Sequence, residues 1–171
     1  LMLLGEGNAI AQIDEAMKDF GYAMGPMALM DEMGLDVVNW VGRFMCDAMG
    51  ERWPEPFKAL GLLVNAGFSG RKNGQGFYTY PKGKKGRKNP NREVYKYVRE
   101  MKNNIADSKK IRERLVLANV NEAARCLEED VIASPGDGDV GAVLGLGFPP
   151  FLGGPFHYAD SLGIEALVKG L

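Results

Sequence analysis

The sequence predicts an all-α protein. Apolar residues recur at helical spacing along most of the chain, and glycine or proline marks the ends of these stretches. No segment alternates apolar and polar residues over the length of a strand, apart from the short stretch Phe77 to Tyr80. With 171 residues, 46% hydrophobic and 25% charged, the composition is ordinary for one soluble domain or two small ones.

The first predicted helix runs from Ala9 to Phe20, with Asn8 as a candidate N-cap. Spacings of three and four residues place one apolar stripe on it: Ile13, Ala16, Met17 and Phe20. Gly21 can take a positive φ, so it ends the helix. A Gly25-Pro26 corner follows, and Pro26 suits the first turn of the next helix.

Two more helices and a helix-like stretch complete the first half. We expect a short helix from Met27 to Met33, with three apolar side chains facing inward: Leu29, Met30 and Met33. Asp36 can cap a helix to about Met49, whose apolar residues are Val37, Trp40, Val41, Phe44 and Met45. Phe57 to Ala66 is helix-like, with Leu60, Leu63 and Val64 on one side.

A glycine-rich turn, Gly70 to Gly76, leads into the aromatic stretch Phe77 to Tyr80. It lacks a phosphate-binding lysine motif and a strand–loop–helix context, so it is a weak nucleotide signal. Pro81 to Asn91 is typical of a linker, and we place a domain boundary there. The predicted domains are residues 1–90 and residues 91–171.

The second half also begins with helices. Glu93 to Ile105 is helix-like, and Ser108 could cap a long helix from about Ile111 to Ile132. Ser134-Pro135 with Asp137 is a strong helix start, because it combines a cap, a proline at N1 and an acid at N3. That helix is expected to end near Gly145 or Gly147.

The two halves share an internal repeat. Asn8 and Ser134 are 126 positions apart, as are Gly21 and Gly147, whereas Gly25-Pro26 and Gly154-Pro155 are 129 positions apart. Asp31 and Asp160 also lie 129 positions apart, as do Gly34 and Gly163. Three extra residues in the second corner explain the change of offset from 126 to 129 positions. Within the helices, the two copies match to within one residue. The sequence therefore predicts a tandem duplication whose two helical units pack on each other.

Charge is unevenly distributed. The net charge is −1, but residues 71–92 hold eight of the 21 basic residues and no acidic ones, so the remainder carries −9. Such a basic island could meet a phosphate group, although a solvated linker is the simpler interpretation, because charge runs are commonly just soluble surface. Aromatic residues beside it (Phe77, Tyr78 and Tyr80) leave single-stranded nucleic acid as a remote alternative.

Cellular location and chain limits follow from simpler features. Two cysteines, Cys46 and Cys126, make no disulfide framework, so a cytoplasmic protein with small buried thiols is expected. No apolar run is long enough to span a membrane. The chain starts with Leu1 and no basic segment precedes it, so we interpret it as the interior of a longer protein.

The residues show no evident catalytic set. His157 is the single histidine, which excludes multi-histidine zinc sites; a role in acid–base chemistry would need Asp160 as its orienting partner. A surface or half-buried position between Phe156 and Tyr158 is the simpler interpretation of His157. Asp31 and Glu32 point to different sides of a helix, so Asp31 is interpreted as a cap or helix–helix hydrogen-bond partner. Clustered methionines suit core filling or an acyl-chain surface: Met17, Met24, Met27, Met30 and Met33.

Several motifs resemble one known family. Residues 13–17, 21–26 and 31–36 resemble the C-terminal domain of 3-hydroxyacyl-CoA dehydrogenases, and residues 70–78 resemble the motif that closes that domain. Residues 121–127 and 138–156 closely resemble the last domain of the α-subunit of the multifunctional fatty acid oxidation complex. The resemblance covers essentially the whole chain.

The resemblance implies a role as well as a fold. The fold would be two domains similar to the C-terminal part of 6-phosphogluconate dehydrogenase, the first truncated at its start and the second at its end. The longer enzyme would oxidise (3S)-hydroxyacyl-CoA to 3-ketoacyl-CoA with NAD, and would also carry an enoyl-CoA hydratase domain. The NAD-binding Rossmann domain, the catalytic histidine and its glutamate partner would lie outside this chain. We therefore expect no cofactor site, no metal and no catalytic residue here, and an inactive fragment.

What remains by resemblance is shape. The corner would lie beneath the acyl-CoA, and Leu144 matches a position where some relatives place an aromatic residue near substrate. The substrate-binding candidates are Met24, Gly25, Pro26, Leu144, Gly145, Phe148, Arg71 and Lys72. The expected partners are acyl-CoA and the Rossmann and hydratase domains. An assembly module that holds a thiolase β-subunit without touching substrate is the alternative.

Overall fold

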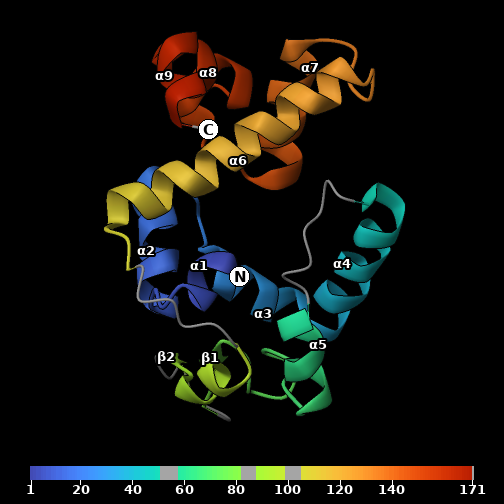
Figure 1. Ribbon diagram of the computed structural model, residues 1–171, viewed down its shortest axis with the longest axis vertical. Coiled ribbons are helices and arrows are strands. Elements are labelled where there is room, and N and C mark those ends of the chain that lie inside the picture. The colour runs from blue at the N-terminus through green and yellow to red at the C-terminus, as the bar shows by residue number, and fades with distance from the viewer. Residues whose placement is uncertain (51–57, 82–87, 99–104, 171) are drawn as a thin grey trace. The chain divides into compact units, whose positions relative to one another are not determined.

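The computed structural model describes residues 1–50, 58–81, 88–98 and 105–170. Within them the chain is mostly helical, as predicted, with one pair of two-residue strands (Figure 1). It divides into two compact units. Unit 1 comprises Leu1–Asp14 and Met24–Ile105, and unit 2 comprises Glu15–Ala23 and Ala106–Leu171. Among the helices described, none has the length and apolar character needed to cross a membrane.

Unit 1 contains the first helices and both strands. Its elements are α1 (Met2–Gly5), the start of α2 (Ile10–Phe20), α3 (Pro26–Met33), α4 (Leu35–Met49), α5 (Lys58–Asn65), β1 (Tyr78–Thr79), β2 (Asn89–Pro90) and the 3-10 helix η2 (Arg92–Lys96). Helix α4 packs against α3 and α5, and β1 pairs antiparallel with β2. Fully buried side chains form the core: Leu4, Ile10, Ile13, Met27, Leu35, Leu60, Leu63, Phe77 and Val94.

Unit 2 is built around one long helix. Its elements are the end of α2, α6 (Ser108–Glu128), α7 (Pro135–Gly141), the π-helix η3 (Ala142–Leu146), the 3-10 helix η4 (Pro150–Leu152), α8 (Pro155–Leu162) and α9 (Ile164–Gly170). Helix α6 packs against α7, α8 and α9 (Figure 1). The core of this unit consists of Met17, Phe20, Val116, Val120, Ala142 and Phe148.

The strongest predicted helix signals are confirmed. Gly21 has a φ of +124° directly after α2, and Pro26 occupies the first turn of α3. The Ser134 hydroxyl accepts a hydrogen bond from the Asp137 N–H at 3.2 Å and donates one to the Asp137 carboxylate at 2.7 Å. These signals are local, because each depends only on neighbouring backbone groups.

Several helix boundaries differ from prediction. Helix α2 begins at Ile10, and Gly34 rather than Asp36 precedes α4. The cap of α6 is Asp107, whose carboxylate accepts from the Lys110 N–H at 2.8 Å, so the predicted cap Ser108 is wrong by one residue. Among the described residues of 93–105, only the short 3-10 helix η2 forms. Residues 82–87, within the predicted linker, lie outside the described residues.

The inward-facing side of α3 was predicted wrongly. Leu29 and Met33 are 46% and 48% exposed, whereas Met27, Ala28 and Asp31 are buried. On α4 the apolar residues Trp40 and Phe44 are 69% and 60% exposed, and their rings stack with centroids 6.2 Å apart. Periodicity shows that a helix has an apolar side, but it does not show which element covers that side.

Both Gly-Pro corners have the same capping arrangement. In unit 1 the Asp14 carboxylate accepts the N–H groups of Met27 and Ala28, at 2.7 and 3.1 Å. In unit 2 the Asp139 carboxylate accepts those of Phe156 and His157, at 2.7 and 3.2 Å. Each aspartate lies on an α-helix that precedes the corner in the chain, α2 or α7, and satisfies the first free N–H groups of the helix after the corner.

Candidate functional site

The Gly25-Pro26 corner is built around the buried carboxylate of Asp14. Besides capping α3, this carboxylate accepts a hydrogen bond from the Tyr78 hydroxyl at 2.8 Å. Asp14 is only 2% exposed. A Cβ added at Gly25 would lie 2.4 Å from Asp14 Cα, so the close approach of the corner to α2 requires glycine. The corner is therefore held rigidly by polar contacts within unit 1.

Asp31, at the other end of α3, holds the glycine-rich segment, which we define as residues 67–80. Asp31 is 0% exposed. Its carboxylate accepts hydrogen bonds from the N–H groups of Phe77 and Tyr78, at 2.9 Å each, and from the Tyr80 hydroxyl, at 3.0 Å. Its backbone carbonyl accepts the Arg71 N–H at 2.9 Å. Asp31 thus joins α3 to a segment about forty positions away, which refines its predicted role as a cap or hydrogen-bond partner.

Burial and hydrogen bonding oppose each other at Asp31. Burial raises the pKa of its carboxyl group above the ordinary value, while the N–H groups of Tyr78 and Phe77 and the Tyr80 hydroxyl act to lower it. Burial, together with the Asp31 carboxylate, raises the pKa of the Tyr80 hydroxyl. Tyr80 therefore stays protonated and can donate to Asp31. The arrangement is a structural clamp made of one acceptor and three donors.

We predict that Gly76→Ala destabilises the chain by about 1–3 kcal/mol, the usual cost of overpacking. A Cβ at this position would lie 1.9 Å from the Asp31 carboxylate, so the clamp would have to open. Urea unfolding followed by circular dichroism measures the change. Gly141→Ala is the matched control, because a Cβ there meets nothing within 4 Å. We expect that helical substitution to be neutral or stabilising by about 0.5–1 kcal/mol; equal losses for both variants would contradict the clamp.

The glycine-rich segment does not fit a dinucleotide phosphate. Many of its N–H groups are already engaged: those of Ser69 and Gly70 donate to the Gln75 carbonyl at 3.0 and 2.9 Å, and those of Phe77 and Tyr78 donate to Asp31. The strand that follows pairs antiparallel and leads into no helix. A phosphate cradle needs free N–H groups at a helix N-terminus. An NAD-binding site is therefore not supported by this segment.

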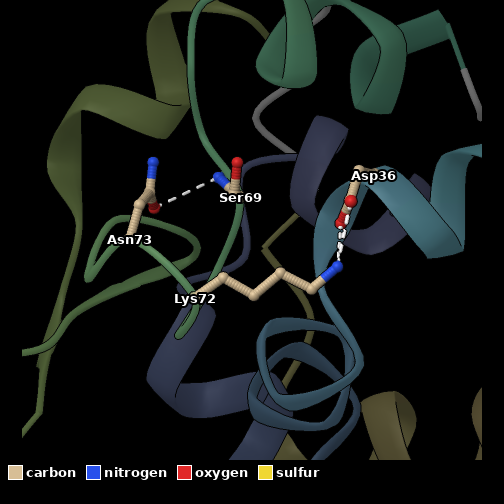
Figure 2. A network of polar contacts seen from close by, with 4 residues as sticks. All are labelled: Asp36, Ser69, Lys72 and Asn73. Carbon is tan, nitrogen blue, oxygen red and sulfur yellow. Dashed lines mark hydrogen bonds and ion pairs between the residues drawn. The ribbon is translucent and has the colours of Figure 1, made fainter.

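Arg71 and Lys72 are exposed and paired with acidic residues of α3 and α4. Arg71 forms an ion pair with Glu32, and Lys72 Nζ lies 2.7 Å from the Asp36 carboxylate (Figure 2). Their side chains are 62% and 47% exposed. In the same segment, the Asn73 side-chain oxygen accepts the Ser69 N–H at 3.4 Å (Figure 2). The two cations are therefore held in place yet remain open to solvent.

We predict that Asp36 titrates below the ordinary carboxyl pKa of 3.8. The hydrogen bond from Lys72 is the main cause of this lowering. Any stability from the pair is therefore present above the ordinary carboxyl pKa and is lost as pH falls through the lower folded pKa. Carboxyl-carbon NMR titration measures the value, and Lys72→Ala is expected to return it toward the ordinary value. An unchanged Asp36 titration in that variant would contradict the assignment.

The predicted site residues of unit 1 do not converge on one point. Gly25 and Pro26 lie at the start of α3, with Met24, 38% exposed, just before them. Arg71 and Lys72 pair at the far end of α3 and the start of α4. Helix α3 has eight residues, so these groups are separated by about 12 Å along its axis. The two groups could contact different parts of one extended ligand, but not the same atoms.

The candidates of unit 2 occupy different environments. Leu144 and Gly145 lie in the π-helix η3, where Leu144 is 82% exposed. Phe148 is 0% exposed in the core, with its ring 5.9 Å from that of Phe20 and 6.0 Å from that of Tyr22. Leu144 is therefore available to a ligand in this structure, whereas the Phe148 side chain supports the core.

His157 shows no catalytic arrangement. It is exposed, its backbone N–H donates to Asp139, and its ring lies against Gly153, where an added Cβ would be 2.6 Å from Cδ2. No hydrogen bond joins His157 to Asp160 among the described residues. Within the same residues, no group of three or more potential metal ligands occurs.

Asp14 and Asp139 are the important residues that sequence reasoning did not identify. Each caps the helix after a Gly-Pro corner from a position 11 or 15 residues before that corner's glycine. The two aspartates are 125 positions apart, one fewer than their flanking repeat positions. That single-residue slack was visible in the sequence, and it could have drawn attention to them.

Comparison with known proteins agrees with the motifs. Residues 1–80 match the family model described as 3-hydroxyacyl-CoA dehydrogenase, C-terminal domain. The match ends at Tyr80, the last residue of the glycine-rich segment. The chain is 45% identical over 167 residues to fatty acid oxidation complex subunit alpha from Shewanella baltica, and 45% identical to that from Shewanella putrefaciens. These alignments cover 98% of this chain but 24% of each relative, so the chain spans about a quarter of their length.

A solved structure gives a consistent result. The dehydrogenase part of multifunctional enzyme 1 from C. elegans matches with a TM-score of 0.56 and 30% identity, covering 75% of this chain and 29% of that one. The structural match, the alignments and the family model agree on one family. Residues 1–80 are thus similar to the C-terminal domain of 3-hydroxyacyl-CoA dehydrogenases, and nearly the whole chain is similar to part of the fatty acid oxidation complex α-subunits.

Proposed function

We propose that this chain is part of a fatty acid β-oxidation enzyme that oxidises (3S)-hydroxyacyl-CoA to 3-ketoacyl-CoA with NAD. The observation that carries the proposal is the match of residues 1–80 to the dehydrogenase C-terminal domain, in a chain that aligns over 98% of its length with fatty acid oxidation relatives. The longer protein also carries enoyl-CoA hydratase and Rossmann domains. In it, the present chain forms part of the acyl-CoA cleft and contacts other domains.

The geometry favours a shaping role over a reacting one. Asp14 and Asp31, the buried carboxylates of the corner region, are occupied by hydrogen bonds to backbone N–H groups and tyrosine hydroxyls. Neither is free to move a proton to or from a substrate. The exposed surface offers apolar and cationic groups instead, namely Met24 in unit 1, Leu144 in unit 2, and Arg71 and Lys72 on the glycine-rich segment. The apolar side chains of Met24 and Leu144 suit an acyl chain, and the cations of Arg71 and Lys72 suit a phosphate.

We also propose that residues 1–90 and 91–171 are tandem copies of one helical domain, with bounds that differ from those of the compact units because residues 15–23 belong to unit 2 and residues 91–105 to unit 1. The shared carboxylate caps at Asp14 and Asp139 support this proposal. After them, the Tyr22 N–H donates to the Met17 carbonyl at 3.2 Å, and the Phe148 N–H donates to the Ala142 carbonyl at 3.1 Å. The stretch from Asp139 to Phe148 is one residue longer than the stretch from Asp14 to Tyr22. The π-helix η3 accommodates this extra residue. This insertion explains the one-residue slack between the copies.

Calorimetric titration with a 3-hydroxyacyl-CoA tests the cleft role. We expect the 171-residue chain to bind, and the double variant Arg71→Ala, Lys72→Ala to bind on the order of tenfold more weakly, because charge-assisted contacts to phosphate are lost. Lys96→Ala is the matched control, since Lys96 is an exposed lysine paired with Glu93. No binding by the wild-type chain, or equal weakening by the control, would contradict the cleft role.

An assembly module is the second candidate. It is favoured by the apolar side of α4, where Val37, Trp40, Val41 and Phe44 are between 39% and 69% exposed. Contiguous exposed apolar side chains commonly mark protein interfaces. In this alternative the chain would hold a thiolase β-subunit or a neighbouring domain and would not bind acyl-CoA. Calorimetry distinguishes the two candidates. If the chain is an assembly module, titration with acyl-CoA gives no heat of binding. The chain then binds a thiolase subunit, and Trp40→Lys abolishes that binding.

A further inference from the structure

Asp160 on α8 occupies the position in unit 2 that Asp31 occupies in unit 1. Both follow a Gly-Pro corner, and both are followed three residues later by a glycine and then by a large aliphatic residue, Leu35 or Ile164. Their surroundings differ sharply. Asp31 and Leu35 are 0% exposed, whereas Asp160 is exposed and Ile164 is 77% exposed. The carboxylate of Asp160 has no hydrogen-bond or ion-pair partner among the described residues of unit 2.

In unit 1, Asp31 is covered by the glycine-rich segment. The glycine-rich segment presents two consecutive N–H groups, from Phe77 and Tyr78, to one carboxylate. It can approach this closely because glycines stand at the contacts. A Cβ at Gly70 would lie 2.4 Å from the Asp31 carbonyl oxygen, and one at Gly76 1.9 Å from its carboxylate. The occupant of this face in unit 1 is therefore a glycine-rich turn that leads into aromatic residues.

We propose that the face of unit 2 around Asp160 and Ile164 is a docking site for a glycine-rich segment of the same kind as residues 67–80. The inference rests on the proposed duplication and on the chain being part of a longer protein, whose remaining three quarters would supply the segment. Two backbone N–H groups of the segment donate to the Asp160 carboxylate, and an aromatic side chain covers Ile164. Burying these groups together satisfies the acceptor and removes apolar surface from water.

The segment holds much of its shape by itself, which makes it usable as a probe. Besides the two bonds to the Gln75 carbonyl, the Gly76 N–H donates to the Tyr78 carbonyl and the Tyr80 N–H donates to the Gly74 carbonyl, both at 2.9 Å. The Asn73 amide donates to the Gly67 carbonyl at 2.7 Å. These contacts lie within residues 67–80, so a peptide of that sequence is pre-organised.

The test titrates the 171-residue chain with a fluorescein-labelled peptide of residues 67–80 and follows fluorescence anisotropy. We expect the peptide to bind the wild-type chain, and we expect Asp160→Asn and Ile164→Asp in the chain each to weaken this binding at least tenfold. A peptide that carries Gly70→Ala and Gly76→Ala is not expected to bind. Asp19→Asn, a change at another exposed acid in unit 2, is the matched control and should bind as the wild type does. Equal binding by the wild type and Asp160→Asn would overturn the proposal.

A second experiment tethers the peptide to the chain, in case the free peptide binds too weakly to be detected. The same sequence is fused after Leu171 through about 25 glycine and serine residues, which gives a millimolar effective concentration. We expect the fusion to raise the thermal midpoint by several degrees, and Asp160→Asn to abolish that rise. No rise would overturn the proposal. Neither experiment involves acyl-CoA or NAD, so its failure is distinct from failure of the proposed function.

Discussion

Asp31→Ala is expected to lower the free energy of unfolding by about 3–5 kcal/mol. The substitution leaves two buried donors, the N–H groups of Phe77 and Tyr78, and one half-buried donor, the Tyr80 hydroxyl, without this acceptor. Each unsatisfied buried donor costs about 1–3 kcal/mol, although water entering the gap recovers part of the loss. The glycine-rich segment would detach from α3 first, because Asp31 supplies its main polar contact with that helix.

Urea denaturation followed by circular dichroism measures this loss, and hydrogen exchange at the Phe77 and Tyr78 amides locates it. Asp160→Ala is the matched control. It removes the equivalent carboxylate from an exposed position without partners in unit 2, so we expect a change within about 0.5 kcal/mol. Similar losses for both variants, or unchanged amide protection in Asp31→Ala, would show that the Asp31 contacts do not hold the segment.

Phe148→Ala is expected to destabilise unit 2 by about 3–5 kcal/mol, the usual cost of deleting a buried aromatic side chain. The Phe148 ring lies between those of Phe20, Tyr22 and Tyr158, with centroids 5.9, 6.0 and 6.3 Å away. Removing it leaves a cavity that these rings cannot fill without leaving their edge-to-face packing. The prediction follows from a side chain that is 0% exposed.

Thermal unfolding of Phe148→Ala, compared with Leu144→Ala, checks this assignment. Leu144 is 82% exposed four residues earlier, so its truncation should change stability by no more than about 0.5 kcal/mol. The same pair separates structural from binding roles in an acyl-CoA titration of folded protein. A Phe148→Ala variant as stable as the wild type would mean that this core is not packed as the structure describes.

Local features of the fold could be predicted from the sequence. Gly21, Pro26 and the Ser134-Pro135 start each act through the backbone of their own helix ends, so residue type alone identifies them. The hydrogen bonds of Asp31 to the glycine-rich segment could not be predicted in detail, because they join residues more than forty positions apart. The same limit explains why Leu29 was placed inside when it is 46% exposed.

The candidate site was predictable only by resemblance. The motifs of residues 21–26 and 70–78 identified the family, and the match of residues 1–80 confirms it. Physical reasoning on single residues could not separate Leu144, which is exposed, from Phe148, which is buried, because both are apolar and close in sequence. Leu144 lies within the π-helix η3, whereas Phe148 comes two residues after its end and packs in the core.

Whether this chain carries a reacting group is decided most directly by assaying NADH formation. The purified 171-residue chain is mixed with NAD and a (3S)-hydroxyacyl-CoA, and absorbance of the reduced nicotinamide is followed over hours. The proposed role predicts no NADH above the rate without protein, while calorimetry under the same conditions still detects acyl-CoA binding. NADH formation that scales with the concentration of the chain would contradict the proposal that it shapes the cleft without performing the chemistry.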